Sequence, residues 1–176
     1  MEDAYYMELA LEQAADAFVR GEFPVGCVIV QGGDVIAVGQ RKGTISDQSF
    51  FSEIDHAEIR ALRSLEALET RFEPEKTTLY VTMEPCLMCF GAIILSGIRK
   101  IVYAYEDPMG GGTRCNLNGL PPLYKNCGVE IVPGLLRGKS LDLFARFFIN
   151  ETNLYWKNSY LEAYTLGQKT KAIQEK

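Results

Sequence analysis

The spacing of hydrophobic and polar residues changes along the chain in a way that predicts alternating helices and strands. Residues 3–20 place apolar side chains at helical intervals and acidic side chains on the other faces, which predicts an amphipathic helix that ends at Gly21. Two short apolar runs, 25–30 and 35–38, flank a Gln-Gly-Gly-Asp turn, and this arrangement predicts a β-hairpin. The chain is therefore expected to open with one helix followed by two paired strands.

After the hairpin, segments of helical spacing alternate with short β-type runs. A polar, turn-rich stretch over 43–54 predicts a loop. Further helices are expected over 56–69, from Pro85 to about Gly97, and from Ser140, which would cap a last long helix that continues or breaks near Asn150. Further strands are expected over 77–82, 99–105 and 129–132. The alternation predicts an α/β protein, with a mixed sheet covered by helices on both faces.

Length and composition narrow the domain organisation. The chain has 176 residues, of which 47% are hydrophobic, so it can form one domain with a substantial core. We expect this single domain to cover 1–165. Residues 166–176 lose the pattern, and we expect them to form a flexible tail.

Charge and hydropathy exclude some classes of partner. The formal net charge is −5, which gives no support for non-specific binding to nucleic acid or to an anionic membrane. No run approaches the ~18 consecutive apolar residues of a membrane helix, so no membrane partner is expected. The N-terminus carries acidic residues where a signal peptide would carry basic ones. We therefore predict a cytoplasmic protein.

Two short motifs carry most of the candidate chemistry. The first is His56-Ala57-Glu58, which contains the only histidine of the chain, and the second runs from Pro85 through Cys86 to Cys89. Each motif is expected to open a helix. Residues three apart share a helix face, and a helix N-terminus favours thiolates, so Cys86 and Cys89 can present two sulfur ligands to one metal ion.

If the two helix starts lie side by side, His56 completes a three-ligand zinc site. Three protein ligands leave a tetrahedral zinc one open position, where the pKa of a water falls to about 7. Glu58 lies two residues past His56 and so points in another direction, where it would face this water and move protons. The sequence thus predicts zinc as the cofactor and Glu58 as the catalytic residue.

Each motif taken alone also has a simpler interpretation. A Cys-x-x-Cys pair after a strand is typical of thiol–disulfide proteins as well as of metal sites. Asp55 followed by Glu58 fits a helix capping box, in which Glu58 is a cap and not a catalyst. A structural zinc would need a fourth ligand, for which Cys27, Cys115 and Cys127 are available. The two motifs together, however, match the H-x-E and P-C-x-x-C pattern of zinc deaminases, which favours the catalytic interpretation.

On these residues the chain resembles the cytidine/adenosine deaminase superfamily, and it looks closest to the bacterial tRNA adenosine deaminases and related nucleobase deaminases. The resemblance spans roughly residues 5 to 150. It is carried by the zinc motifs and by flanking runs, namely Phe23-Pro24-Val25-Gly26-Cys27-Val28, residues 56–62, residues 79–89, Gly91-Ala92-Ile93 and Ser96-Gly97-Ile98.

The resemblance implies a three-layer α/β/α fold with a five-stranded mixed sheet in the order 2-1-3-4-5. It also implies hydrolytic deamination, in which Glu58 protonates a ring nitrogen and then passes a proton to the leaving ammonia. Relatives are usually homodimers. The substrate pocket implied by the matching positions consists of Pro24, Val25, Gly26, Arg41, Ala57, Glu84, Pro85 and Asp107.

Two departures from the family pattern concern the substrate. Many relatives carry an asparagine just after the second strand, where this chain has Gln40 and Arg41. The loop over 43–54 is longer and more apolar than in the tRNA enzymes, and it contains Phe50 and Phe51. A tRNA adenosine therefore remains one substrate class, and a free base or nucleoside such as guanine, cytosine or cytidine remains the other.

Overall fold

The computed structural model describes residues 2–45, 51–68 and 72–174. A five-stranded sheet forms its centre, in the order β2-β1-β3-β4-β5, which confirms the predicted topology. Strands β1 and β2 form an antiparallel hairpin, β3 pairs antiparallel with β1, and β4 and β5 continue in parallel. The strands are β1 (Gly26–Gln31), β2 (Asp34–Gln40), β3 (Thr77–Met83), β4 (Lys100–Tyr105) and β5 (Glu130–Pro133).

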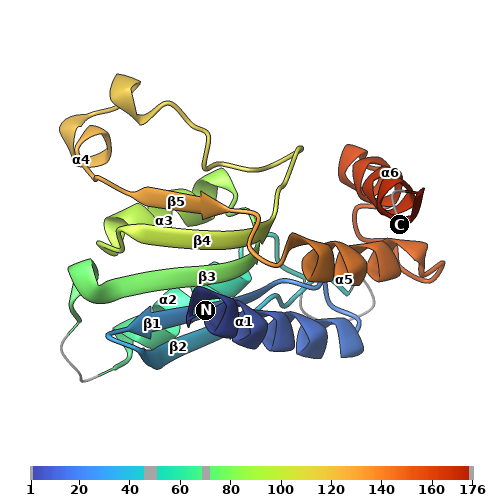
Figure 1. The fold of residues 1–176 in the computed structure, drawn as a ribbon, viewed down its shortest axis with the longest axis horizontal. Coiled ribbons are helices and arrows are strands. Elements are labelled where there is room, and N and C mark those ends of the chain that lie inside the picture. The colour runs from blue at the N-terminus through green and yellow to red at the C-terminus, as the bar shows by residue number, and fades with distance from the viewer. Residues whose placement is uncertain (1, 46–50, 69–71, 175–176) are drawn as a thin grey trace.

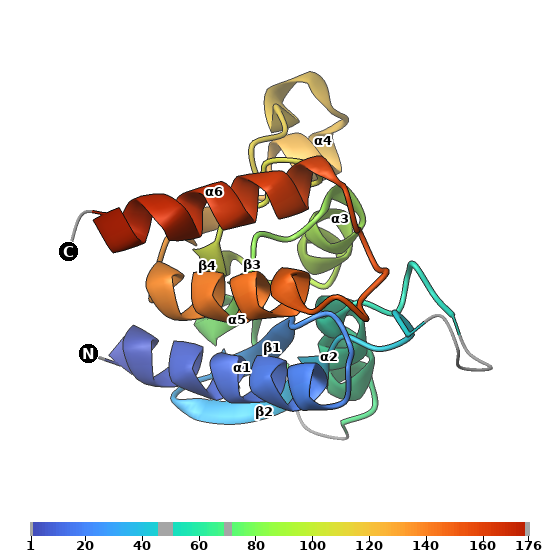
Figure 2. The same ribbon diagram turned by 90° about the vertical axis from the view of Figure 1, so that its right-hand side faces the viewer.

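Helices cover both faces of the sheet and complete the expected three layers. In Figure 1, α1 (Glu2–Val19) lies in front of the strands, while α2 (Ala57–Glu66) and α3 (Leu87–Leu95) lie behind them. Figure 2 shows α5 (Arg137–Ile149) next to α1, with α6 (Tyr160–Gln174) stacked on α5. The remaining short elements are η1 (Pro74–Lys76), η2 (Leu117–Gly119) and α4 (Pro122–Lys125). Within the described ranges no helix is both long and apolar enough to cross a membrane.

The central strands are buried on both faces, which explains their continuous apolar sequences. Val28, Tyr80 and Val102 pack against α1 in one cluster. Ile29 and Leu79, their neighbours in the sequence, point to the opposite face and join the cluster that includes α2 and α3. Because successive side chains of a strand alternate between faces, each central strand contributes to both cores.

The last part of the chain differs from the prediction in two places. Ser140 does not cap a helix, because α5 already begins at Arg137, after Leu136 adopts a left-handed φ of 56°. The Ser140 hydroxyl is buried and donates a hydrogen bond to the Thr82 carbonyl oxygen at 2.6 Å. It therefore fastens α5 to the end of β3.

A sixth helix follows the break at Asn150. The expected domain boundary at residue 165 falls inside α6, which continues through Gln174, so residues 166–174 are helical. The buried Thr165 accepts or donates a hydrogen bond with the Tyr105 hydroxyl at 3.1 Å, and Leu161 is also buried. Regular structure thus extends beyond the expected boundary, and the first half of α6 packs on the domain.

Candidate metal centre and catalytic pocket

The chemically interesting residues gather at one end of the sheet. Cys86 lies just after β3, Asp107 just after β4, and Arg41 just after β2, while Val25 precedes β1. Since β1 runs antiparallel to both β2 and β3, and β4 runs parallel to β3, these four positions lie at the same end of the sheet. Ligands of α/β proteins commonly bind outside the carboxyl ends of the parallel strands, and this end of the sheet holds the carboxyl ends of β3 and β4.

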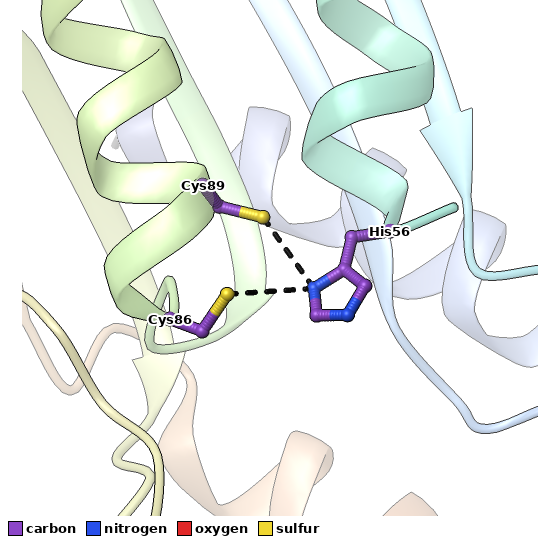
Figure 3. A group of neighbouring side chains, drawn as sticks. All are labelled: His56, Cys86 and Cys89. Atoms are coloured by element: carbon purple, nitrogen blue, oxygen red, sulfur yellow. Dashed lines mark hydrogen bonds between the residues drawn. The ribbon is translucent and has the colours of Figure 1, made fainter. Parts of the chain in front are cut away.

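His56, Cys86 and Cys89 converge from the starts of α2 and α3, as Figure 3 shows. His56 and Cys86 are the residues that immediately precede the two helices, and both have extended backbones that turn their side chains toward the gap between the helices. Nδ1 of His56 lies 3.6 Å from Sγ of Cys86 and 3.4 Å from Sγ of Cys89. All three donor atoms lie within 4.8 Å of one another.

This geometry fits a tetrahedral zinc ion. With Zn–N near 2.0–2.1 Å and Zn–S near 2.3 Å, a tetrahedral angle separates the nitrogen and sulfur ligands by about 3.5 Å. The two observed N···S distances of 3.6 and 3.4 Å bracket this value. One nitrogen and two sulfur donors are also the ligand types that zinc prefers.

The surroundings of Cys86 stabilise its thiolate form. Hydrogen bonds from Cys89 and then from His56 lower the pKa of Cys86 to about 4, although partial burial opposes the change. The Cys86 backbone also stands at the N-terminus of α3, where the helix dipole favours negative charge. A thiolate ready at neutral pH is what metal binding requires.

The metal group contains three residues and no fourth within the described part of the chain. All five cysteines are free thiols, and Cys27, one of the possible fourth ligands of a structural zinc, is buried in the core. Three protein ligands with one open position are typical of a catalytic zinc site, whereas structural sites have four protein ligands.

Glu58 lines the same pocket and does not cap its helix. Its residue is 3% exposed, and α2 has no side-chain cap. Asp55, the expected partner in a capping box, instead forms an ion pair with Arg60 at 2.9 Å. Burial raises the pKa of the Glu58 carboxyl, an effect that the nearby His56 partly offsets. A carboxyl group with a raised pKa can exchange protons near neutral pH, as a general acid and base must.

A cavity of about 390 Å³ opens in front of the metal group. Five of the expected pocket positions line it, together with His56, Glu58 and Cys86: they are Val25, Arg41, Ala57, Glu84 and Asp107. Pro24, Gly26 and Pro85 do not line it. Gly26 instead faces α1, where an added Cβ would come within 2.2 Å of the Ala10 carbonyl oxygen.

Half of the lining residues lie outside the expected pocket, metal and catalytic positions. The additional residues are Phe23, Glu53, Met83, Met109, Gly110, Tyr155, Trp156 and Leu161. Phe23 and Met83 belong to runs that carry the family resemblance, and Gly110 lies three residues after Asp107, so these positions were an available signal. The last three come from the segment between α5 and α6 and from α6 itself, beyond residue 150, and no local pattern marks them.

Arg41 is buried, with 2% exposure, and its guanidinium is occupied by neighbouring groups. It donates hydrogen bonds to the carbonyl oxygens of Lys42 and Ser52, both at 2.8 Å. It also donates to the Tyr155 hydroxyl at 3.3 Å and lies 3.7 Å from the Glu53 carboxylate. Arg41 therefore acts within the pocket wall and joins the loop after β2 to the C-terminal part of the chain.

Glu84 and Asp107 organise the loop after β4. The Glu84 carboxylate accepts hydrogen bonds from the Asp107 backbone N–H at 3.1 Å and from the Thr113 hydroxyl. The Asp107 side chain accepts from the backbone N–H groups of Met109 and Gly110, both at 2.9 Å. The pKa of Asp107 is raised mainly by burial. Both acids thus shape the rim of the pocket through the backbone that they hold.

Comparison with known proteins agrees with this site. The family model for the cytidine and deoxycytidylate deaminase zinc-binding region matches residues 1–105. The tRNA-specific adenosine deaminase of Bacillus subtilis (strain 168) is 36% identical over 148 residues, which cover 84% of this chain and 89% of that protein. The corresponding enzyme of Streptococcus pyogenes serotype M18 is 35% identical over 147 residues, covering 84% and 90%.

Solved structures give the same result. A structure from a study of tRNA:A34 deaminases superposes with a TM-score of 0.63 and 35% identity, over 79% of this chain and 98% of that one. A crystal structure of a complex with 2,6-diaminopurine superposes with a TM-score of 0.71 and 25% identity, over 87% and 85%. Fold and site together define a zinc-dependent hydrolytic deaminase, of the kind that the tRNA adenosine deaminases represent. The chain belongs to the cytidine and deoxycytidylate deaminase family.

Proposed function

We propose that this site releases ammonia from an amino-substituted nucleobase ring. In this proposal His56, Cys86 and Cys89 hold the zinc ion, and Glu58 is the catalytic residue that moves protons. The observation that supports it most directly is the convergence of the three donor atoms within 4.8 Å of one another, in a pocket that Glu58 also lines. The expected reaction adds water to the ring carbon and breaks its bond to the exocyclic nitrogen.

Glu58 has the properties that the proton transfers require. When bound, zinc supplies the lowered water pKa that makes a hydrolytic nucleophile available at neutral pH. The Glu58 carboxyl, whose pKa is raised by burial, takes up the proton that the water loses and donates a proton to the ring nitrogen. It then takes the remaining proton from the hydroxyl group that water has added to the ring carbon and delivers it to the departing amine. The carbon–nitrogen bond breaks, ammonia leaves, and the ring carbon becomes a carbonyl.

The pocket walls would orient the base. Phe23, Val25 and Met83 contribute apolar surface, which suits the faces of an aromatic ring. Ala57 contributes the first turn of α2, whose backbone N–H groups have no partners within the helix and would be available to a polar edge of the base. Glu84 already accepts hydrogen bonds from its own loop, so its role in the proposal is to position that loop.

Two substrate classes fit this reaction. The relatives from Bacillus subtilis and Streptococcus pyogenes are tRNA-specific adenosine deaminases, and their likeness supports an adenosine in tRNA. The residues from beyond position 150 that line the cavity support a free base or nucleoside.

We further propose that two copies of the chain form a homodimer through α3. Leu87 and Leu95, which lie on one side of this wholly apolar helix, are 63% and 62% exposed. Contiguous apolar surface of this kind is typical of protein–protein interfaces. Leu95→Glu should give a monomer in analytical ultracentrifugation, while Val19→Glu, at an exposed position on α1, should leave the dimer intact. A monomeric unaltered chain would contradict the proposal.

A cytoplasmic location is also part of the proposal. The named activity of the relatives on tRNA supports it. So does the use of two free thiols as metal ligands, because thiols stay reduced in the cytosol.

The test of the proposed reaction combines metal analysis with ammonia release. The purified chain should bind about one zinc per chain, the number that a three-ligand catalytic site holds. The zinc-loaded protein should release ammonia from at least one amino-substituted base, nucleoside or anticodon stem-loop RNA, and removal of zinc by a chelator should abolish the release. A metal-free protein with a Cys86–Cys89 disulfide, or zinc-loaded protein inactive on every such compound, would overturn the proposal.

A further inference from the structure

The segment that joins α5 to α6 closes one side of the catalytic cavity. Tyr155 and Trp156 from this segment, and Leu161 from the start of α6, line the cavity together with His56 and Cys86 of the metal group. Figures 1 and 2 both place this segment at the end of the sheet where the loop after β2 also lies. A smaller hollow between Phe51 and Trp156 marks where the two segments meet.

Tyr155 is held against the pocket wall by several independent contacts. Its hydroxyl donates a hydrogen bond to the Glu53 carboxylate at 3.0 Å and accepts one from Arg41 at 3.3 Å. Its ring packs 5.3 Å from the Phe23 ring, centre to centre. The Asn153 side chain makes hydrogen bonds with both the backbone N–H and the carbonyl oxygen of Tyr155. These contacts hold the segment at the cavity, and they assign the buried Arg41 the role of positioning Tyr155.

Trp156 follows in a conformation that bulky residues rarely adopt. Its φ is 55°, in the left-handed region, and its side chain lines both the cavity and the smaller hollow. Strained backbone of this kind persists where the surrounding structure holds it, and it is concentrated at functional sites. Trp156 is 43% exposed, which places it at the mouth of the cavity between solvent and substrate.

The charges around the cavity disfavour phosphate groups. Four carboxylate residues line it, Glu53, Glu58, Glu84 and Asp107, against one arginine. That arginine, Arg41, already contacts Glu53 and two carbonyl oxygens. Sites for polynucleotides instead combine stacking surfaces with a positively charged groove that follows the backbone. Arg114, whose side chain is 75% exposed, lies 4.0 Å from the Glu84 carboxylate but outside the lining. A phosphate inside the cavity would therefore meet acidic side chains, with Arg41 as the one arginine or lysine of the lining.

The comparisons point in the same direction. The tRNA:A34 deaminase structure superposes over 98% of its own length but only 79% of this chain, so about a fifth of this chain has no counterpart there. Tyr155, Trp156 and Leu161 all follow residue 150, whereas the motifs that carry the family resemblance lie roughly within residues 5 to 150. No motif of the family accounts for the closing segment.

We propose that Tyr155 and Trp156 restrict the site to an uncharged free base or nucleoside, and that nucleotides and folded RNA are excluded. The inference rests on the proposed deaminase reaction and selects one of its two substrate classes. Tyr155 and Trp156 are specificity-determining residues, and Arg41 positions Tyr155. Apolar walls with a closed side accept a planar ring, whereas a base within RNA brings flanking nucleotides that this segment obstructs.

The first experiment measures ammonia release by the zinc-loaded full chain. The panel comprises adenine, guanine and cytosine, their nucleosides, the corresponding 5′-monophosphates, and an anticodon stem-loop RNA with adenosine at the wobble position. The best base or nucleoside should exceed its own monophosphate and the RNA by at least ~100-fold in kcat/KM, since contacts between like charges disfavour binding. A monophosphate or RNA within ~10-fold of the best small substrate would overturn the inference and leave the deaminase proposal standing. Inactivity on the whole panel would overturn the deaminase proposal itself.

A second experiment tests the two residues directly. Tyr155→Phe keeps the ring packing on Phe23 but removes the hydroxyl bonds to Arg41 and Glu53. It should raise KM for the best small substrate by ~10-fold, with kcat within ~3-fold. The lost hydrogen bonds would hold the segment less firmly at the cavity, so the substrate would bind more weakly. Tyr5→Phe, at an exposed position on α1, is the matched control and should change neither parameter. An unchanged KM in Tyr155→Phe would overturn the role of Tyr155.

Trp156 supplies a spectroscopic readout because it is the only tryptophan of the chain. Its fluorescence should change when the best small substrate is added to zinc-loaded Glu58→Gln protein, in which turnover is suppressed. The anticodon stem-loop RNA should leave the emission unaltered. A change with RNA, or none with the small substrate, would contradict the placement of Trp156 at the cavity mouth.

Discussion

Nδ1 of His56 lies 3.4 Å from Sγ of Cys89, although His56 immediately precedes α2, Cys89 lies in α3, and strand β3 separates the two helices in the sequence. The contact exists because α2 and α3 cover the same face of the sheet and both begin at the end of the sheet where the cavity lies. Cys86 meets the same nitrogen at 3.6 Å, from the residue just before α3. The fold itself therefore assembles a set of three ligands at the floor of the cavity.

Removal of either sulfur ligand should eliminate stable zinc binding. Cys86→Ser and Cys89→Ser should each lower zinc affinity by more than ~100-fold, a larger loss than the 10–100-fold typical when a ligand merely loses a hydrogen-bond partner. Zinc content after dialysis against a chelator, measured by elemental analysis, checks this. Cys115→Ser is the matched control, because Cys115 is exposed and lies outside the metal group, and it should retain about one zinc per chain. Full zinc retention in Cys89→Ser would contradict the ligand assignment.

Gly112 allows the loop after β4 to pack on the start of α3. An added Cβ would lie 2.6 Å from both the backbone nitrogen and Cα of Leu87, and backbone atoms cannot move aside easily. Gly112→Ala should therefore destabilise the protein by about 1–3 kcal/mol, the usual cost of overpacking. It should also weaken zinc binding, because Leu87 directly follows Cys86.

Urea denaturation and zinc titration of Gly112→Ala check both effects. Gly119→Ala is the control, since nothing lies within 4 Å of the position that its Cβ would occupy. If the two variants behaved alike, the close approach of the loop to α3 would not be a constraint on the fold.

The ion pair between Glu106 and Arg137 should make stability depend on pH. Burial alone would raise the pKa of Glu106, but hydrogen bonds from Arg137 and Tyr164 outweigh burial and lower it below its usual value of 4.5. A carboxyl group with a lowered pKa in the folded state adds stability above its unfolded pKa, and it loses that contribution as the pH falls through the folded pKa.

Glu106→Gln should accordingly lower the unfolding free energy by about 1 kcal/mol at pH 7, a modest value because both side chains are partly exposed. The difference from the unaltered chain should shrink as the pH falls below about 4.5. Urea unfolding across this range is the measurement, with Glu130→Gln at an exposed position as the control. A difference that grew toward acid pH would reverse the expected sign and reject the account of this pair.

The sequence pattern predicted the strands, the family resemblance implied their order, and two motifs singled out four residues that the fold brings together at one pocket. His56, Glu58, Cys86 and Cys89 lie in two short motifs, where spacing along a helix decides which side chains share a direction. The strands were predictable for the same reason, because continuous apolar runs mark strands that are buried on both faces. Local patterns thus sufficed wherever the determining interactions are local.

The remaining features depend on contacts between distant parts of the chain. Tyr155 is held at the pocket by a hydrogen bond from Arg41, which lies 114 positions earlier in the sequence. No local sequence pattern predicts a contact between residues so far apart. Ser140 looked like a helix cap because serine is a common capping residue, but its hydroxyl satisfies the Thr82 carbonyl across the fold. Gly26 lies in a motif-like run, yet it serves the packing of α1 on β1 and not the pocket.

The most direct test of the central claim is the turnover of zinc-loaded Glu58→Gln. The substitution removes the acid–base group but keeps the size of the side chain, so the protein should hold about one zinc per chain and lose at least ~100-fold in kcat. Glu66→Gln, at an exposed position on the same helix, is the matched control and should keep full activity. Ammonia release by zinc-loaded Glu58→Gln at the rate of the unaltered chain would contradict the claim that Glu58 moves the protons of the reaction.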